Sequence, residues 1–317
     1  MRLPILCIFF AILLPQVASA TTYQPTGPIE RRYAADGAWV TATMVTNACD
    51  REGNLCDIWY PSDLGSNALK HETTGFRHPA IVFADGTSDK IAADYAAFFL
   101  RHLASWGFIV IRSRDGATGQ GDTVLDTASF LLDSSRNTGS IFYGKVDADN
   151  VGLVGHSQGA ATTTLLFSRN TPIFKTYVPI ETPIRPFCVI AKCTIDLAAL
   201  PKVTHGSIFY IGGDLDAVSS LPTNLGYYAP TSSKIDKVMG MIAGGSHGEI
   251  QGNPGCESVG IPLYCNIGAY PLLGYPTAWF MWKLQNAADG PAAFAENGEL
   301  SHAAPNWLGV LSNIRER

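Results

Sequence analysis

The pentapeptide Gly155-His156-Ser157-Gln158-Gly159 carries the residue types that point most directly to chemistry. A short apolar run precedes it and a helix-prone run follows it, so we expect a strand, a sharp turn and a helix, with Ser157 at the turn. The two glycines lack the Cβ atom that would collide with neighbouring backbone in so tight a turn. A serine held in this way is a candidate nucleophile, because the N–H of the next residue points to the same place.

A second match to the same pattern surrounds Ser246. It also follows an apolar run, but the residues after it contain several glycines and Pro254, which do not continue as a helix. It also comes late in the chain and leaves few acidic residues before the last histidine, His302. Ser157 is therefore the nucleophile candidate, and the second match is of interest for its histidine, His247.

Three predicted strands lead into residue types that work together in acyl transfer. The strands 151–154, 207–211 and 237–243 run into Ser157, Asp216 and His247, in that order. A serine hydroxyl is a weak nucleophile, so a neutral imidazole must accept its proton. A carboxylate then fixes the tautomer of the imidazole and stabilises its cation. Because the carboxyl ends of parallel strands meet at one edge of a sheet, we expect these three side chains to lie together.

The acid and the histidine each have a rival. Asp214 is two residues from Asp216, and we favour Asp216 because the extra turn after the strand gives it reach, with Asp214 as a turn-forming residue. His302 competes with His247, but it lies in a polar segment with no strand before it. The other histidines are interpreted as surface or helix residues, except the one beside the nucleophile, which should pack beneath the turn: they are His71, His78, His102, His205 and, beneath the turn, His156.

An oxyanion formed in acyl transfer needs two backbone N–H donors. Gln158 supplies one of them. The loop after the predicted strand 79–84 should supply the other, and Thr87 is the expected donor. The alternative interpretation of this loop is a plain turn that caps the next helix through Ser88 or Asp89.

The N-terminus has the pattern of a secretion signal. Arg2 precedes an apolar run at 3–14, and residues 18–20 read Ala-Ser-Ala, so residues 1–20 are predicted to be removed. The apolar run is too short to span a bilayer, and no cysteine follows it to carry a lipid anchor. We expect a secreted or periplasmic monomer in which residues 21–317 form a single domain. The net charge of −5 favours neither nucleic acid nor an anionic membrane as a partner.

The cysteines beyond the predicted signal form three sequence-local couples. An even number of cysteines in an exported chain indicates disulfides. The local spacing favours the pairs Cys49–Cys56, Cys188–Cys193 and Cys256–Cys265. A metal site is the alternative, but no couple has the C-x-x-C spacing typical of zinc ligands.

The order of predicted elements is that of an α/β protein. Residues 21–37 are polar and are expected to wrap the surface. The expected strands are 39–45, 57–60, 79–84, 108–111, 151–154, 176–180, 207–211 and 237–243, and the expected helices are 89–106, 122–133, 160–167 and 276–287. Strands that alternate with helices indicate a mostly parallel central sheet with helices on both faces.

Together these motifs resemble the secreted dienelactone-hydrolase-type branch of the α/β-hydrolases. That branch includes bacterial cutinases and polyester hydrolases, chlorophyllase-like proteins and esterases similar to platelet-activating-factor acetylhydrolase. The resemblance runs from about residue 57 to residue 307 and rests on the segments 59–61, 105–110, 151–159, 182–183, 213–217 and 244–247, and on a closing segment from 278–280 to 305–307. It implies an α/β-hydrolase fold and a serine hydrolase that cleaves carboxylic esters through an acyl-enzyme. It implies no metal or organic cofactor, and the chain lacks the H-E-x-x-H, P-loop and dinucleotide motifs.

Three positions depart from the pattern of the polyester hydrolases. Where those relatives usually carry two aromatic residues that clamp a terephthalate-like ring, this chain has Thr87 and Ile184, and Ile184 is the predicted substrate-binding residue. Ala160 replaces a common second glycine, a small change on the helix side. We therefore expect small or aliphatic ester substrates, with a polyester- or cutin-type hydrolase or a lipase as the first alternative. An acyltransferase and a non-catalytic binding protein on the same fold are the remaining alternatives.

Overall fold

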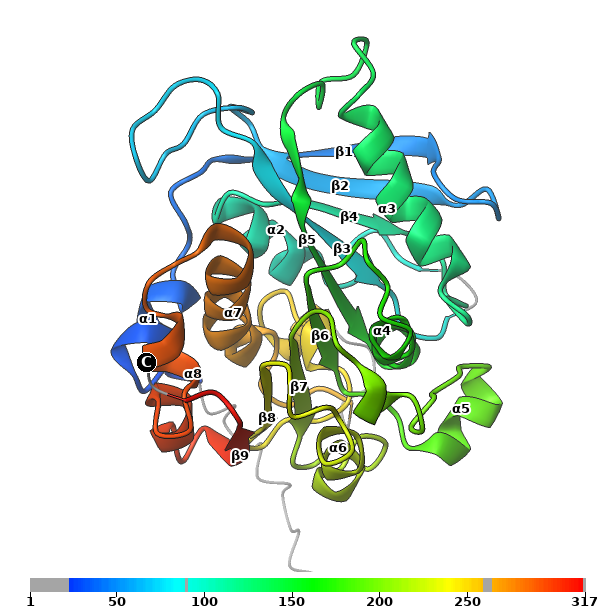
Figure 1. Cartoon of the computed structure of the whole chain (residues 1–317), viewed down its shortest axis with the longest axis vertical. Coiled ribbons are helices and arrows are strands. Elements are labelled where there is room, and N and C mark those ends of the chain that lie inside the picture. The colour runs from blue at the N-terminus through cyan, green and yellow to red at the C-terminus, as the bar shows by residue number, and fades with distance from the viewer. Residues whose placement is uncertain (1–22, 89–90, 259–263, 316–317) are drawn as a thin grey trace, which may run out of the picture.

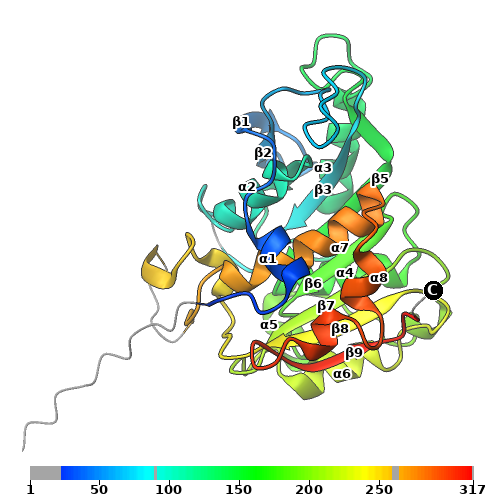
Figure 2. The ribbon, with the colours of Figure 1, turned by 90° about the vertical axis from the view of Figure 1, so that its left-hand side faces the viewer.

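The computed structural model describes residues 23–88, 91–258 and 264–315, and Figures 1 and 2 show it from two sides. The predicted secretion signal, residues 1–20, lies outside the described residues. Within the described residues, nine strands form one sheet in the order β1-β2-β4-β3-β5-β6-β7-β8-β9. The protein therefore has an α/β fold, as its sequence predicts.

The strands from β4 to β8 in the sheet order run parallel to one another. The strands are β1 (Thr41–Ala48), β2 (Leu55–Pro61), β3 (His78–Ala84), β4 (Ile109–Ser113), β5 (Val146–His156), β6 (Thr176–Ile180), β7 (Ile208–Gly213), β8 (Lys237–Ile242) and β9 (Trp307–Ser312). Antiparallel pairing is confined to the two edges, where β1 and β2 flank β4 and where β9 pairs with β8. The prediction of a mostly parallel sheet is confirmed.

Helices connect the strands and cover the sheet. They are α1 (Pro28–Ala34), α2 (Ala97–Ser105), α3 (Asp122–Ser134), α4 (Gln158–Ser168), α5 (Arg185–Ala191), α6 (Leu221–Tyr228), α7 (Gly274–Gln285) and α8 (Gly290–Phe294). Short 3₁₀ segments are η1 (Leu200–Lys202), η2 (Glu249–Gln251), η3 (Cys256–Ser258), η4 (Tyr270–Leu272) and η5 (Glu299–His302). None of the helices in the described residues has the length and apolarity needed to cross a bilayer.

The sheet separates two apolar layers, because successive side chains of a strand point to opposite faces. On β3, Ile81 and Phe83 belong to the layer that contains α1, α2, α7 and α8. Ala80 and Val82 belong to the opposite layer, which contains α3, α4 and α6. Figure 1 shows these two sets of helices on opposite sides of the sheet. Strands buried on both faces read as continuous apolar runs, which is why the parallel strands are recognisable in the sequence.

The helix expected at 89–106 is wrong in its first half, because α2 begins only at Ala97. Residues 89 and 90 lie outside the described residues. In the segment before α2, three backbone carbonyls accept hydrogen bonds of 2.5–2.9 Å from the buried guanidinium of Arg112. They are the carbonyls of Ala92, Ala93 and Tyr95. Carbonyls that bind Arg112 do not continue a helical ladder, so a contact from a distant strand overrides the local apolar periodicity.

The surface segment expected at 21–37 contains a helix, α1. Pro28 lies in its first turn, where a missing N–H costs nothing. The backbone N–H groups of Ile29 and Glu30 donate to the carboxylate of Glu299 at 2.9 and 2.8 Å. Figures 1 and 2 show α1 packed beside α7. A cap supplied from a distant part of the chain is not visible in the local sequence.

Two histidines expected at the surface or on a helix face are fully inside the protein. His78 begins β3, and its ring binds the N–H of Gly65 and the carbonyl of Gly107 at 3.0 and 2.8 Å. His102 lies on α2, as expected, but it is buried and its Nε2 donates to the carbonyl of Tyr33 at 2.8 Å. Burial lowers the pKa of both rings. Both are structural residues that join neighbouring segments.

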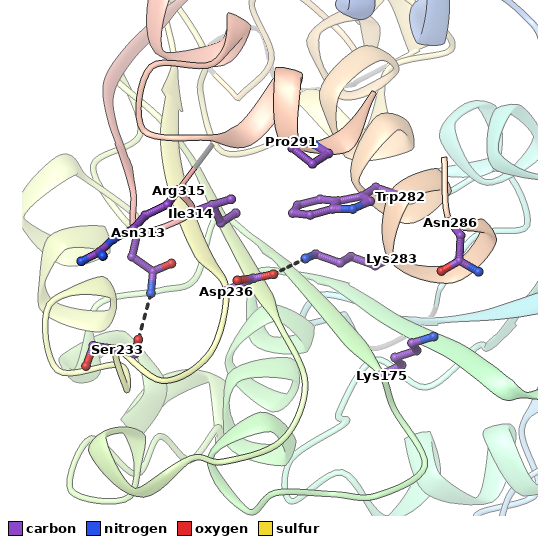
Figure 3. Close-up of a pocket in the computed structure, with 10 residues that line it drawn as sticks. All are labelled: Lys175, Ser233, Asp236, Trp282, Lys283, Asn286, Pro291, Asn313, Ile314 and Arg315. Atoms are coloured by element: carbon purple, nitrogen blue, oxygen red, sulfur yellow. Dashed lines mark hydrogen bonds and ion pairs between the residues drawn. The ribbon is translucent and has the colours of Figure 1, made fainter. Parts of the chain in front are cut away.

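A cavity of about 880 Å³ lies at the amino-terminal edge of the sheet. Lys175 and Asp236 line it directly before β6 and β8 begin, and Lys283 of α7 forms an ion pair with Asp236 at 2.6 Å (Figure 3). Ser233 and Asn313 lie beside this pair. The cavity is thus at the opposite edge of the sheet from Ser157, which follows the carboxyl end of β5.

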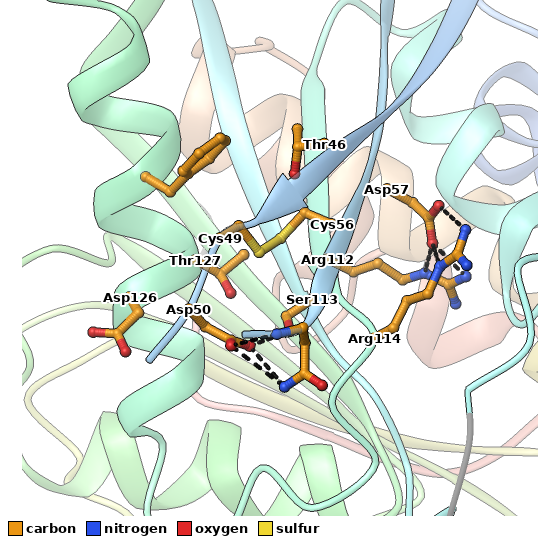
Figure 4. Close-up of a disulfide and its surroundings, with 12 residues drawn as sticks. Thr46, Cys49, Asp50, Cys56, Asp57, Arg112, Ser113, Arg114, Asp126 and Thr127 are labelled. Carbon is orange, nitrogen blue, oxygen red and sulfur yellow. Dashed lines mark hydrogen bonds and ion pairs between the residues drawn. A yellow bond between two sulfur atoms is a disulfide. The ribbon is translucent and has the colours of Figure 1, made fainter. Parts of the chain in front are cut away.

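The three predicted disulfides are confirmed. The Cα atoms are 5.9 Å apart in Cys49–Cys56, 4.6 Å in Cys188–Cys193 and 5.5 Å in Cys256–Cys265. All three separations suit a disulfide. Figure 4 shows that the first joins the residue after the end of β1 to the start of β2, two strands that pair antiparallel.

Candidate active site

The turn between β5 and α4 holds Ser157 in a strained conformation. Its φ of 54° and ψ of −117° are unusual for a residue with a side chain. A Cβ atom at Gly155 would overlap the carbonyl of Gly159, and one at Gly159 would overlap the carbonyl of Ala84. Both glycines are therefore required by close backbone approach, and the serine hydroxyl stands above the carboxyl edge of the sheet.

Ser157, His247 and Asp216 form one hydrogen-bonded chain. The Ser157 hydroxyl oxygen lies 2.8 Å from Nε2 of His247, and Nδ1 of the same ring lies 2.7 Å from Oδ2 of Asp216. The Asp216 carboxylate is fully buried and its other oxygen accepts the N–H of Val218 at 2.7 Å. The His247 ring keeps 12% of its surface exposed. With Nδ1–H donated to Asp216, Nε2 is free to accept the serine proton.

Asp214 serves a different purpose from Asp216. It is exposed, and its Oδ1 accepts the N–H of Gly244 at 2.6 Å. It therefore ties the loop after β7 to the loop after β8, next to His247. The structure places Asp216 against the histidine and Asp214 in a turn, as the sequence predicts.

The rival serine and histidine do not take part in this arrangement. Ser246 is buried, and its hydroxyl donates to Oε1 of Glu249 at 3.0 Å. His302 is exposed at the end of η5, where its Nδ1 donates to the carbonyl of Gly298 at 3.1 Å.

Two loops meet where an oxyanion would form beside Ser157. Gln158 is the first residue of α4, so its N–H has no acceptor within the helix. Thr87 is exposed in the loop after β3. The residue before it, Gly86, is so close that a Cβ added there would lie 3.4 Å from Cβ of Ser157. The arrangement brings both predicted donor segments close to Ser157.

A buried ion cluster supports the loop that carries Thr87. Arg112 binds Asp57 at 2.9 Å, and Arg114 also binds Asp57 at 2.6 Å (Figure 4). Arg112 binds Asp85 as well, at 3.4 Å. Burial raises the pKa of Asp85 to about 8, although the nearby guanidinium of Arg112 opposes the shift. Asp85 directly follows β3, so the cluster fixes the start of the loop.

Glu249 is a buried carboxylate that organises the loop after His247. Its Oε1 accepts the N–H and hydroxyl of Ser246 and the N–H of Asn266, at 2.8, 3.0 and 2.9 Å. Its Oε2 accepts the N–H groups of Ile267 and Gly268 at 2.8 and 2.6 Å. The donors of Asn266, Ile267 and Gly268 directly follow Cys265, so Glu249 and the Cys256–Cys265 disulfide together hold this segment close to the loop that carries His247.

Ile184 directly precedes α5 and lies beside the loop that carries Asp216. Its N–H donates to the carbonyl of Val218 at 2.9 Å, and 40% of the residue is exposed. The buried side-chain amide of Gln158 donates to the carbonyl of Ala191 at the end of α5. The residue after the nucleophile is thus joined to a helix that carries Ile184 at one end and the Cys188–Cys193 disulfide at the other.

Two buried polar residues behind Ser157 were not predicted to act at the site. His156 and Glu181 follow the same rule as the triad residues, because each lies at the carboxyl end of a parallel strand, β5 and β6. Burial lowers the pKa of His156 to about 4 and raises the pKa of Glu181 well above its ordinary value. The signal in the sequence was a charged residue directly after the apolar run 176–180.

Two groups of side chains bring possible metal ligands within 4.8 Å of one another in the described residues. One group consists of His156, Glu181 and His247, and the ring nitrogens of its two histidines already have hydrogen-bond partners. The other is Glu249 with Cys256 and Cys265, whose sulfurs form a disulfide. In the first set only Oε1 of Glu181 lacks a hydrogen-bond partner among the described residues, and in the second set both sulfurs are held in the disulfide.

A scan against models of known protein families finds no match to this chain, and a search of curated proteins finds none either. The interpretation of the site therefore depends on its geometry and on the sequence motifs.

Proposed function

We propose that this protein is a secreted serine hydrolase of the α/β-hydrolase fold that cleaves carboxylic esters, related to the dienelactone-hydrolase-type branch. The observation that carries the proposal is the chain from Ser157 through His247 to Asp216, with distances of 2.8 and 2.7 Å. Such a chain, on a strained turn beside the loops that carry the N–H groups of Gln158 and Thr87, suits attack on an acyl carbon. Three disulfides agree with an oxidising, extracytoplasmic location.

Acylation uses the three side chains in sequence. Nε2 of His247 accepts the proton of Ser157 while the serine oxygen bonds to the ester carbonyl carbon. The negative oxygen of the tetrahedral intermediate accepts hydrogen bonds from the N–H groups of Gln158 and Thr87. Asp216 stabilises the imidazolium that has formed. His247 then returns its proton to the departing alkoxide, and the alcohol leaves an acyl-enzyme.

Deacylation reverses the roles. A water molecule gives a proton to Nε2 of His247 and adds to the acyl carbon. The second tetrahedral intermediate is held by the same two N–H groups. Its collapse returns the proton to the oxygen of Ser157 and releases the carboxylic acid.

The proposed substrates are small or aliphatic esters. Ile184 is partly exposed beside the site. It offers an aliphatic contact at the position where polyester hydrolases usually have an aromatic side chain. An aromatic partner contributes about 0.5–1.5 kcal/mol to ring binding beyond area burial. A chain without two such partners should bind an aromatic polyester about one to two orders of magnitude more weakly.

A fluorophosphonate probe tests the proposed nucleophile directly. The wild type should be labelled at Ser157, and Ser157→Ala should lose labelling and about three or more orders of magnitude of ester turnover. Ser246→Ala is the matched control, because its hydroxyl faces Glu249, and it should still be labelled. Failure of the folded wild type to react, or labelling at Ser246, would contradict the proposal. The first result would favour a non-catalytic binding protein.

A panel of esters tests the proposed substrate class. Short-chain nitrophenyl esters should be hydrolysed much faster than an amorphous terephthalate polyester. The double variant Thr87→Tyr/Ile184→Trp should raise release of soluble products from the polyester. Fast polyester cleavage by the wild type, with no gain in the double variant, would refute the preference.

A further inference from the structure

A second set of buried polar side chains lies directly behind the proposed triad. His156, at the end of β5, places Nε2 2.7 Å from the backbone carbonyl oxygen of His247 and 2.9 Å from Oε2 of Glu181. Its Nδ1 is hydrogen-bonded to the hydroxyl of Tyr95. The ring centroids of His156 and His247 are 5.1 Å apart. One imidazole thus contacts the nucleophile strand, the catalytic histidine and the segment before α2.

Hydrogen-bond chemistry determines the tautomer of His156. A backbone carbonyl only accepts, so Nε2 of His156 must carry the proton that it donates to His247. Nδ1 is then unprotonated and accepts the hydroxyl proton of Tyr95. Burial, which lowers the pKa of this ring to about 4, keeps it neutral at neutral pH. Each nitrogen therefore has one defined role.

Glu181 holds His156 from the other side. It is fully buried directly after β6, with a φ of 58°, and its N–H donates to the carbonyl of Ile211 at 2.6 Å. Its Oε2 shares the Nε2–H of His156, while Oε1 has no hydrogen-bond partner among the described residues. A non-glycine residue in this backbone region, with an unsatisfied buried oxygen, is costly to maintain and marks a functional constraint.

The same cluster reaches the loop that carries Thr87. A Cβ added at Gly86 would lie 2.7 Å from the hydroxyl of Tyr95 and 3.0 Å from Nδ1 of His156. The Tyr95–His156 pair therefore fills the space beneath Gly86, and a displaced ring would displace the loop.

We infer that His156 and Glu181 are positioning residues that hold the main chain of the catalytic histidine and the oxyanion loop in register with Ser157. This inference rests on the proposed function. The Nε2–H of His156 binds the backbone carbonyl of His247, and Glu181 orients this N–H. Tyr95, bound to Nδ1 of His156, packs against Gly86 and so fixes the position of the oxyanion loop. Small displacements matter, because misplacement of a catalytic group by about 1 Å can cost about 100-fold in rate.

The charged and titratable groups that face Glu181 lie on the segments packed around the carboxyl end of β6. They are His156, Asp216, His247, Glu249, Tyr95 and Tyr264. Burial, the largest cause, and the nearby carboxylates raise the pKa of Glu181, and His247 opposes them. The expected effect of the Glu181–His156 pair is geometric, because Oε2 of Glu181 lies 2.9 Å from Nε2 of His156 and orients its N–H.

Isosteric substitutions separate the hydrogen bond from the packing. In His156→Gln an amide N–H can replace the ring N–H, whereas His156→Met fills similar space without a donor. The rate of fluorophosphonate labelling at Ser157 should fall about 10- to 100-fold in His156→Met and less than about fivefold in His156→Gln. With a short nitrophenyl ester the loss should appear in kcat, with KM within about twofold.

A matched control comes from His78, another buried histidine with two backbone partners. His78→Met and His78→Gln should lower the melting temperature but leave the labelling rate of the folded protein near wild type. Equal labelling rates for the two His156 variants, or an equal loss in His78→Met, would overturn the inference. An unlabelled wild type would instead overturn the proposed function, so the two failures are distinguishable.

Three further variants test the inference if neither His156 variant folds. Tyr95→Phe removes one hydroxyl and should slow labelling about fivefold, as expected for one lost hydrogen bond. Glu181→Gln keeps an oxygen acceptor and should label faster than Glu181→Met. A Tyr95→Phe protein that labels at the wild-type rate, or no difference between the Glu181 variants, would refute the positioning role.

Discussion

Replacement of Glu249 by glutamine is expected to destabilise the protein strongly, although the two side chains have nearly the same shape. The carboxylate accepts five hydrogen bonds, three at Oε1 and two at Oε2, and the residue is fully buried. Glutamine offers only one acceptor oxygen. Whichever way its amide is turned, the NH₂ group faces at least two donors.

The size of the effect follows from this count. A hydrogen bond to a charged group contributes about 1.5–3 kcal/mol, so the loss of two gives about 3–6 kcal/mol. For a domain of this size, about 2 °C of melting temperature corresponds to each kcal/mol. Glu249→Gln should therefore melt about 6–12 °C below the wild type. Because Ser246 binds Glu249 and precedes His247, ester turnover should fall as well.

Thermal unfolding followed by circular dichroism measures the effect, with Glu257→Gln as the control. Glu257 lies in the same loop region but is exposed, so the same chemical change there should shift the melting temperature by less than about 1 °C. If Glu249→Gln and Glu257→Gln melt within about 1 °C of each other, the five hydrogen bonds accepted by Glu249 do not stabilise the fold as we argue.

Three further predictions concern the turn, the acid and the pH dependence. Asp216→Asn should lower kcat about 10⁴-fold, whereas Asp214→Asn should stay within about tenfold of wild type; equal losses in an ester assay would reverse the choice of acid. Gly159→Ala should destabilise by about 1–3 kcal/mol in urea unfolding because its Cβ overlaps backbone, whereas Gly226→Ala, in open space on α6, should be neutral or stabilising. The pKa of His156 is lowered to about 4, so between pH 6.5 and 4 the unfolded chain binds a proton that the folded protein does not. Stability should fall with decreasing pH across that window by about 3 kcal/mol more in the wild type than in His156→Gln, and parallel pH curves would refute this.

The proximity of Ser157, Asp216 and His247 was predictable because each residue obeys a local rule and a chain-order rule together. Ser157 stands in a glycine-flanked turn, and Asp216 and His247 follow apolar runs in the expected order. The structure brings the three side chains into one chain of hydrogen bonds. Glu181 follows an apolar run in the same way, but its contact with His156 depends on burial between neighbouring strands, which a one-dimensional pattern does not contain.

The parts of the fold that were missed depend on contacts between distant residues. The helix expected at 89–106 is shortened by Arg112, which lies on β4. Strand β9 escaped prediction because it is an edge strand whose apolar residues Leu308 and Leu311 are exposed, so its pattern does not mark a buried face. The central parallel strands, which are apolar on both faces, were recognised.

The cap that Glu299 provides for α1 has a consequence for the order in which the chain can fold. The capped N–H groups, those of Ile29 and Glu30, are separated from Glu299 by 270 and 269 residues. A ribosome makes α1 before any strand of the sheet and makes its cap only after β8. Contacts of such long sequence separation form late and slow the final steps of folding. During synthesis, α1 therefore remains uncapped until almost all of the described chain has emerged.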